Sequence, residues 1–250
     1  MRYAVLIPVY NEREWLPRMI ERLDAACPPR LPDGTPCART LVLVDDGSTD
    51  GSDELVRSIA QRDDAICDVL PANAGKGAAL RRAIELALES GVDAAIVQDA
   101  DLEYDPGEHP AVLAPILSGQ ADAVIGTRFL GETHRVLYYW HSIANRLITT
   151  ASNMLSNLNL TDIECGFKAF TSPVMRRLRL TENRFGVEPE IVARLAKMRL
   201  RDGDGAHERA LRIYEVPIGY AGRTYAEGKK IGWRDGVSAI RAIARHNLFG

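Results

Sequence analysis

Three acidic side chains follow an apolar segment that ends at Gln98. Asp99 and Asp101 come directly after that segment, and Glu103 lies two positions further on. Carboxylates this close repel one another, and their oxygens are the ligands that Mg²⁺ and Mn²⁺ prefer, with substrate phosphates completing the coordination. The spacing therefore predicts a divalent metal, Mg²⁺ or Mn²⁺, held by Asp99, Asp101 and Glu103. The alternative is a solvated turn that caps the following helix.

Two further motifs have the chemistry of a nucleotide site. Asp45 and Asp46 end another apolar segment in VDDGSTDGS, where a carboxylate could hold a nucleobase N–H or a ribose hydroxyl. Lys76 lies in NAGKG ahead of a helical pattern, so that backbone N–H groups and the lysine could meet a diphosphate. Turn formation at the first motif and an ordinary helix start at the second are the alternatives.

The elements that must position these motifs alternate along the first half of the chain. Short apolar runs typical of buried strands occur at Tyr3–Val9, Thr40–Val44, Ile66–Leu70, Ala94–Val97 and Ala123–Ile125. Helical spacing of apolar residues lies between them, at Glu14–Ala26, Ser52–Arg62 and Lys76–Glu89. The alternation predicts an α/β fold with a mostly parallel sheet flanked by helices, whose ligands bind at the carboxyl ends of the strands.

The second half has a less regular pattern. It predicts a long, nearly uncharged amphipathic helix, a second helix, a strand and a basic terminal helix, at Leu137–Asn159, Val187–Arg199, Leu211–Val216 and Arg234–His246 respectively. Exposed loops are expected at Cys27–Cys37 and Arg201–Arg209. This half therefore adds a helical and β extension to the predicted sheet.

Composition and charge exclude some classes of protein. The 250 residues carry a formal net charge of −3, which excludes a strongly basic nucleic-acid binder, and the four cysteines form no CxxC pair. Residues 1–127 contain 11 basic and 22 acidic side chains, whereas residues 128–250 contain 20 basic and 12 acidic ones. We expect the acidic half to suit a metal with its nucleotide and the basic half to suit a phosphate or an anionic membrane. Without a leader or a spanning apolar stretch, a cytoplasmic location is expected.

The order of these motifs resembles glycosyltransferase family 2, the inverting enzymes of the GT-A fold. PVYNE, VDDGSTD, the glycine-lysine turn and DAD match the donor half of that family, in this order. GTRF, TDIECGFKAF, FGVEPE and EVPIGYAGRTYAEGKKIGW are similar to its polyprenyl-phosphate branch, whose best-known member is dolichyl-phosphate mannosyltransferase. The resemblance covers nearly the whole chain. It implies one GT-A domain over 1–250, with a nucleotide-sugar and metal half at 1–127 and an acceptor half at 128–250.

The resemblance also implies roles for individual residues. The donor set is Pro8, Tyr10, Glu12, Asp45, Asp46, Lys76 and Gln98, and the metal set is Asp99, Asp101 and Glu103, although the branch often carries a glutamine where Glu103 stands. The acceptor phosphate would meet Arg128, Ser142, Arg223 and Lys229. Several cations converging on one pocket bind a monophosphate through charge-assisted hydrogen bonds. Asp99, Asp101, Arg128 and Arg223 are therefore the catalytic candidates, together with Glu164 in the alternative below.

The activity implied is transfer of a hexose from a nucleotide diphosphate sugar, GDP-mannose or a UDP-sugar, to a polyprenyl phosphate. A phosphate monoester is largely dianionic at neutral pH, so it needs no strong general base. One alternative is a relative that acts on a sugar hydroxyl, for which Asp162 or Glu164 would be the base. Another is a non-catalytic subunit of a membrane assembly that binds the nucleotide sugar. The nucleobase, the sugar and the prenyl length remain open at this point.

Membrane attachment without a spanning helix is a further expectation. Tyr138, Tyr139 and Trp140 begin the charge-poor helix with residue types that settle at membrane interfaces, and Arg241 and Arg245 lie on the basic terminal helix. These features predict peripheral binding to the cytoplasmic face of a membrane, weakened by salt. The alternatives are that both helices pack on the sheet, or that a separate membrane-embedded partner protein holds the enzyme.

Overall fold

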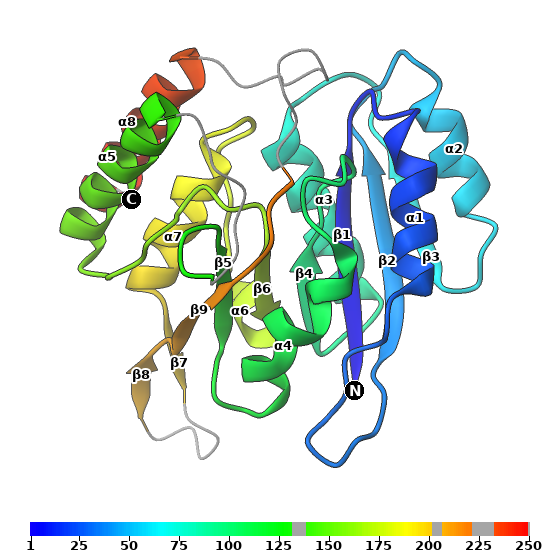
Figure 1. The fold of residues 1–250 in the computed structure, drawn as a ribbon, viewed down its shortest axis with the longest axis horizontal. Coiled ribbons are helices and arrows are strands. Elements are labelled where there is room, and N and C mark those ends of the chain that lie inside the picture. The colour runs from blue at the N-terminus through cyan, green and yellow to red at the C-terminus, as the bar shows by residue number, and fades with distance from the viewer. Residues whose placement is uncertain (132–138, 202–206, 222–232, 250) are drawn as a thin grey trace.

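The computed structural model describes residues 1–131, 139–201, 207–221 and 233–249, and a seven-stranded sheet runs through them (Figure 1). In chain order its strands are β1 (Arg2–Val9), β2 (Ala38–Asp45), β3 (Ala65–Val69), β4 (Ala94–Val97), β5 (Ala123–Thr127), β6 (Lys168–Thr171) and β9 (Ile213–Pro217). The spatial order is β3-β2-β1-β4-β6-β5-β9, and all neighbours are parallel except where β6 meets β4 and β5. The predicted mostly parallel α/β sheet is confirmed, and β6 is an antiparallel strand that the sequence patterns did not indicate.

Helices cover both faces of the sheet. They are α1 (Trp15–Ala25), α2 (Ser52–Ile59), α3 (Lys76–Glu89), α4 (His109–Leu117) after a short 3₁₀ turn η1 (Pro106–Glu108), α5 (Tyr139–Ser156), α6 (Ser172–Arg177), α7 (Val187–Lys197) and α8 (Trp233–Leu248). The bounds of α3 match the prediction, and those of α1, α2, α5, α7 and α8 fall within a few residues of it. The two ends of the predicted exposed loop 201–209 lie in paired antiparallel strands, β7 (Arg199–Arg201) and β8 (Glu208–Ala210).

The core divides into two layers because side chains alternate across a strand. On β1, Ala4 and Leu6 point to the face covered by α3, α6 and α7. Tyr3, Val5 and Ile7 point to the opposite face, which α1, α2 and α4 cover. Burial on both faces explains why these strands are continuous apolar runs without polar alternation. It also leaves the ends of the strands as the places where polar side chains can reach solvent.

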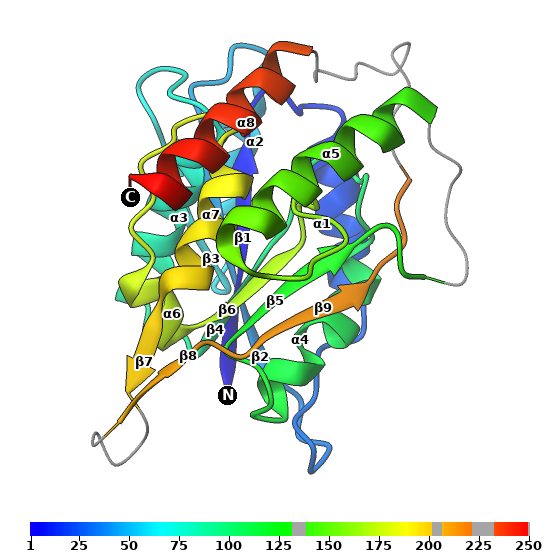
Figure 2. The same cartoon turned by 90° about the vertical axis from the view of Figure 1, so that its left-hand side faces the viewer.

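In the second half, α5 and α8 pack on α7, which itself covers the sheet. α5, α7 and α8 contact one another, and α5 lies beside α8 at the outside of this group (Figures 1 and 2). Among the described helices, none combines the length and apolar character needed to cross a membrane. Tyr138 lies outside the described residues, so only Tyr139 and Trp140 of the predicted aromatic start can be placed.

Candidate functional site

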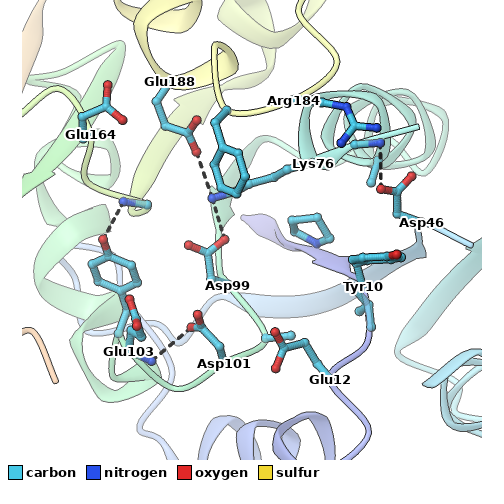
Figure 3. A pocket seen from close by; sticks show the side chains of 18 of the residues that line it. Tyr10, Glu12, Asp46, Lys76, Asp99, Asp101, Glu103, Glu164, Arg184 and Glu188 are labelled. Atoms are coloured by element: carbon cyan, nitrogen blue, oxygen red, sulfur yellow. Dashed lines mark hydrogen bonds and ion pairs between the residues drawn. The ribbon is translucent and has the colours of Figure 1, made fainter. Parts of the chain in front are cut away.

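The predicted motifs meet at one edge of the sheet. β1, β2 and β4 are parallel, so the residues that follow them, Tyr10, Asp46 and Asp99, emerge on the same side. β5 runs in the same direction, because it is antiparallel to β6 and β6 is antiparallel to β4, and Arg128 follows its end. A cavity of about 350 Å³ lies at this edge (Figure 3). Its lining includes ten predicted residues: Pro8, Tyr10, Glu12, Asp46, Lys76, Asp99, Asp101, Glu103, Arg128 and Glu164.

Asp46 joins two of the motifs that the sequence kept separate. One carboxylate oxygen accepts from the backbone N–H of Ala74 at 2.8 Å, and the other accepts from Gly75 N–H at 2.8 Å and Asn73 Nδ2 at 2.9 Å. Burial raises the pKa of Asp46, while the backbone N–H groups favour its charged form. The carboxylate therefore fixes the 73–75 loop against the end of β2, beside the cavity.

Two predicted donor residues do not line the cavity. Asp45 is fully buried, and its Oδ2 accepts from Ser48 N–H at 2.9 Å, which stabilises the turn after β2. Gln98 is also fully buried and bonds to backbone and to His109. Both side chains point into the protein beneath the strand ends, because consecutive residues leave a strand on opposite faces. The structure thus gives both side chains positions that support the strand ends beside the cavity.

Lys76 lies between two carboxylates. Its Nζ is 2.8 Å from Asp99 Oδ1 and 2.9 Å from Glu188 Oε1 (Figure 3). Burial opposes its charge, but the two carboxylates outweigh burial and raise the pKa of Lys76. The turn before it requires a glycine, because Gly75 has φ +103° and a Cβ there would collide with Asn183 O. A cation held this way has little freedom until an anionic ligand competes for it.

Several lining residues on α7 and near it were not predicted as site residues from the sequence. Glu188 lies in the first turn of α7, and Arg184 and Phe185 come just before that helix. Glu188 is buried, and its Oε2 has no hydrogen-bond partner in the described part of the chain. The FGVEPE motif contained this carboxylate, yet no spacing rule linked it to Lys76.

The predicted metal ligands are only partly arranged for a cation. Asp99 Oδ1 contacts Lys76, and Asp99 Oδ2 faces Gly166, where a Cβ would collide with it. Glu103 Oε2 accepts from the hydroxyl of Tyr220 at 2.9 Å. Among residues 1–131, 139–201, 207–221 and 233–249, no three acidic, histidine or cysteine side chains are gathered as a metal site. The predicted three-carboxylate site is therefore not preformed.

The carboxylate oxygens nevertheless fit a hard cation that is coordinated by the protein and by a nucleotide together. Asp101, Glu12 and Glu103 all bring carboxylates to the cavity lining. Mg²⁺ is usually held by one or two carboxylates plus substrate phosphates and not by an all-protein cage. Asp101, in the middle of the loop after β4, is the residue that best fits such a site.

Arg128 is held by a buried carboxylate on the other side of the cavity. Its Nε and Nη2 donate to Asp162 Oδ2 and Oδ1 at 2.6 and 2.8 Å, and its guanidinium lies 5.1 Å from the ring centre of Tyr220. Burial opposes the charge, but Tyr104 and Asp162 hold the pKa of Arg128 well above its ordinary value. Asp162 is fully buried and bonded to this cation, so it does not face the cavity as a free base.

Glu164 faces the cavity and has a different environment. Its Oε1 is buried and lacks a hydrogen-bond partner among the described residues. Burial, followed by the charge of Glu188, raises the pKa of Glu164 to about 7. Of the two carboxylates predicted as alternative bases, Glu164 is the one that can exchange a proton with a ligand near neutral pH.

Of the remaining acceptor predictions, only Ser142 lies among the described residues. Ser142 lies on α5 and does not line the cavity. Arg223 and Lys229 belong to residues 222–232, outside the described residues. Lys168 of the GFKAF motif is buried, and its Nζ donates to the carbonyl oxygens of Ile163 and Cys165. That lysine supports the 163–166 loop and does not contact a ligand site.

Comparison with known proteins identifies the family of this chain. The sequence pattern of glycosyl transferase family 2 matches residues 4–179, which span the donor motifs, β5 and the loop that carries Glu164. The chain belongs to glycosyl transferase family 2. The family resemblance that the motif order indicated is thereby confirmed.

Curated relatives of this family 2 chain include several transferases named for lipid phosphates. It is 31% identical over 183 residues to polyprenol monophosphomannose synthase of Mycolicibacterium smegmatis, covering 72% of this chain and 65% of that protein. It is 28% identical to undecaprenyl-phosphate 4-deoxy-4-formamido-L-arabinose transferase of Aeromonas hydrophila, covering 90% and 62%. It is 29% identical to undecaprenyl-phosphate mannosyltransferase of Micrococcus luteus, covering 96% and 92%. The chain thus spans under two thirds of the first two relatives.

Solved structures confirm the GT-A fold. Glucosyl-3-phosphoglycerate synthase from Mycobacterium tuberculosis, in complex with Mn²⁺, uridine diphosphate and phosphoglyceric acid, superposes with a TM-score of 0.68 over all of this chain and 79% of that one. S. aureus TarS with UDP-GlcNAc gives a TM-score of 0.62 over all of this chain and 67% of that one. Their identities of 19% and 15% support similarity of fold alone.

Proposed function

We propose that this chain transfers a hexose from a nucleotide diphosphate sugar to a polyprenyl phosphate, with inversion at the anomeric carbon and with a divalent metal. The observation that carries the proposal is a single cavity lined from both halves of the chain. Tyr10, Asp46, Lys76 and Asp101 bring nucleotide chemistry from one half, and Arg128 brings phosphate chemistry from the other. The lipid phosphates in the names of three relatives support the same acceptor class.

On the donor side, this chain's residues bind and orient the leaving group. Asp46 fixes the 73–75 loop, and Lys76 at the start of α3 lies within reach of a diphosphate placed over that helix. Glu12 and Asp101 extend the acidic lining beside it. A divalent cation, when bound beside Asp101, supplies charge neutralisation for the departing diphosphate.

On the acceptor side, Arg128 aligns the nucleophile. One oxygen of the acceptor phosphate forms the new bond to the anomeric carbon, while the bond from that carbon to the diphosphate breaks and its electron pair leaves with the diphosphate. Attack from the face opposite the leaving group inverts the configuration. Because the phosphate is already anionic, positioning and electrostatics supply the acceleration. The Asp162 pair keeps the guanidinium in place for this contact.

The second candidate function is transfer to a sugar hydroxyl. The position and the raised pKa of Glu164 favour this function. The group faces the cavity, and its pKa of about 7 suits a general base. Glu164→Gln separates the two reactions. With a phosphate acceptor we expect the rate to fall less than about tenfold, whereas a hydroxyl acceptor that uses this base should lose about 10² to 10⁴-fold. Donor binding should stay the same in both cases.

The exposed side of α5 and α8 supports attachment to a membrane. Trp140, Leu147 and Met154 recur every seven residues on α5 and are 74%, 66% and 80% exposed, and α5 contains no acidic residue. Arg241 and Arg245 of α8 are also exposed. A charge-poor apolar stripe beside basic residues suits the interface of an anionic membrane. We place this face against the cytoplasmic side of the membrane, where the lipid acceptor would enter.

The experiment that tests the function is a donor and acceptor matrix. GDP-mannose, UDP-glucose and UDP-N-acetylglucosamine are each mixed with the protein, a polyprenyl phosphate in detergent and Mn²⁺, and product lipid and released nucleoside diphosphate are measured. We expect one donor to give both products in equal amounts, and excess chelator to stop the reaction. Full turnover in chelator would overturn the metal proposal. Nucleotide-sugar binding without turnover for any acceptor would instead favour a non-catalytic binding subunit.

A further inference from the structure

The side-chain amide of Gln98 bridges the two ends of the loop that carries Asp101. Its Nε2 donates to the carbonyl oxygen of Asp99 at 2.9 Å and to the carbonyl oxygen of Tyr104 at 3.2 Å. Both amide hydrogens are therefore used on backbone carbonyls of the 99–104 loop. The side chain is fully buried, so water does not replace these bonds.

His109, the first residue of α4, sets the orientation of this amide. Its Nε2 is 2.9 Å from Gln98 Oε1, and because that oxygen can only accept, Nε2 carries the proton. Burial lowers the pKa of His109 to about 3, with the charge of Arg39 acting in the same direction, so the ring is neutral. Nδ1 has no partner in the described part of the chain, which agrees with this tautomer. Without the histidine N–H, a flipped amide would place its oxygen against two carbonyls.

The loop between these two carbonyls needs such support. Leu102 has φ +58°, a left-handed conformation that a side chain tolerates only when the surroundings fix it. Glu103 N–H donates to Asp101 Oδ1 at 3.1 Å, and the hydroxyl of Tyr104 accepts from Gly166 N–H at 3.0 Å. The loop thus connects the donor side of the cavity to the 163–166 loop beside Glu164.

We propose that Gln98 and His109 form a clamp that holds the 99–104 loop, so that the Asp101 carboxylate is presented for a nucleotide-bound cation. Both are positioning residues, because neither lines the cavity and each acts through the loop backbone. The inference rests on the proposed function only for what Asp101 binds. The clamp itself is a property of the ligand-free protein.

The tests use the full chain with three variants. The ring centres of His109 and Phe167 are 5.5 Å apart, in an edge-on arrangement. His109→Phe keeps an aromatic ring at this place but removes the N–H donor. His109→Gln is the conservative variant, because its Nε2 can still donate to Gln98. Asp122→Asn is the control for lost stability: Asp122 is buried just before β5, bonds to Arg209 and Arg212, and is absent from the cavity lining.

The first readout is amide hydrogen exchange of residues 99–105 in the ligand-free protein. We expect at least about tenfold faster exchange in His109→Phe, a smaller change in His109→Gln, and none in Asp122→Asn, since lost clamp bonds open this loop locally. Unchanged loop exchange in His109→Phe would overturn the clamp whatever the protein binds.

The second readout is the Mn²⁺ concentration that half-saturates binding of GDP or UDP, measured by calorimetry with each nucleotide. Residues that orient a metal ligand typically contribute 10 to 100-fold to metal affinity, so His109→Phe should raise this concentration by about that factor. Excess Mn²⁺ should restore binding. If Asp122→Asn raised the half-saturating Mn²⁺ concentration by the same factor, general loss of stability would explain the effect, and the clamp would be overturned. Absence of Mn²⁺-dependent binding in the unaltered protein would count against the proposed function, while loop exchange still decides the clamp.

Discussion

The donor and acceptor sides of the cavity stabilise their charged groups in different ways. On the donor side, Asp46 accepts hydrogen bonds from backbone N–H groups of a loop that directly follows the next strand. On the acceptor side, Arg128 depends on the buried Asp162, which arrives from a loop after α5. Apart from Lys76, which lies between two carboxylates, the donor side therefore draws on backbone geometry near the strand ends, whereas Arg128 on the acceptor side depends on a buried pair of charges. Substitutions such as Asp101→Ala on the donor side should therefore lower activity with little change in stability. Substitutions such as Arg128→Met on the acceptor side should lower both.

The helices of the two sides differ as well. On α1, the apolar positions Leu16, Met19 and Leu23 are buried against the sheet. On α5, Trp140 and Leu147 remain exposed, while the buried positions are Thr149 and Ser152. The same helical periodicity therefore indicates a core contact in one place and an open apolar surface in the other.

The largest effect should come from Arg128→Met, which leaves Asp162 charged and buried without its partner. Removing one member of a buried pair typically costs about 3 to 5 kcal/mol, and loss of the phosphate contact should reduce turnover by about 10² to 10³-fold. Urea unfolding and acceptor kinetics measure both losses. In the double variant Arg128→Met/Asp162→Asn, most of the stability should return while turnover stays low. Recovery of turnover in the double variant would contradict the role of Arg128.

On the donor side, Asp101→Ala should separate the two properties. We expect metal-dependent turnover to fall more than about 100-fold, because a cation ligand is lost. The free energy of unfolding should change by no more than about 1 kcal/mol, since the side chain lines the cavity and is not part of the hydrophobic core. A Mn²⁺ titration of activity and urea unfolding test the two parts. If stability fell as far as in Arg128→Met, the contrast between the two sides would not hold.

Glu164 predicts a pH dependence of stability. Its pKa is raised from 4.5 to about 7 in the folded protein, so the folded state binds the proton more tightly than the unfolded state. Stability should therefore fall as pH rises from 4.5 to 7 and then level off, by up to roughly 3 kcal/mol from this group. Glu164→Gln should flatten the curve in that window. Urea unfolding at a series of pH values provides the comparison, and an unchanged slope in the variant would refute the assignment.

The smallest effect concerns the outer face of α8. Arg241→Gln should weaken binding to vesicles with anionic lipid by about fivefold at low salt, since each basic residue near the surface contributes about 1 kcal/mol. Arg57→Gln on α2 is the matched control, as Arg57 is also exposed but lies away from α5 and α8. Co-sedimentation across a salt series measures both. Equal losses in the two variants, or binding that salt does not weaken, would argue against this face and for a membrane-embedded partner.

Two elements that the sequence did not predict show where local patterns are insufficient. β6 has only four residues and begins with Lys168, a residue type that is seldom buried unless its charge is satisfied. α4 contains Pro115 in its interior, which disfavours a helix, and it is apolar on most sides. Both form because surrounding elements complete them: β6 pairs with β4 and β5, and α4 is covered by the sheet.

The sequence by itself determined which side chains end the strands of the first half. Apolar runs, glycines and helical spacing are short-range signals, so they located β1, β2, β4 and α3 and placed Asp46 and Asp99 at one edge. Tertiary structure alone decided which charges meet: Lys76 with Glu188, and Arg128 with Asp162. It also decided that the apolar stripe of α5 faces outward. These contacts join segments far apart in the chain, and their strength depends on burial, which exists only once the layers have packed.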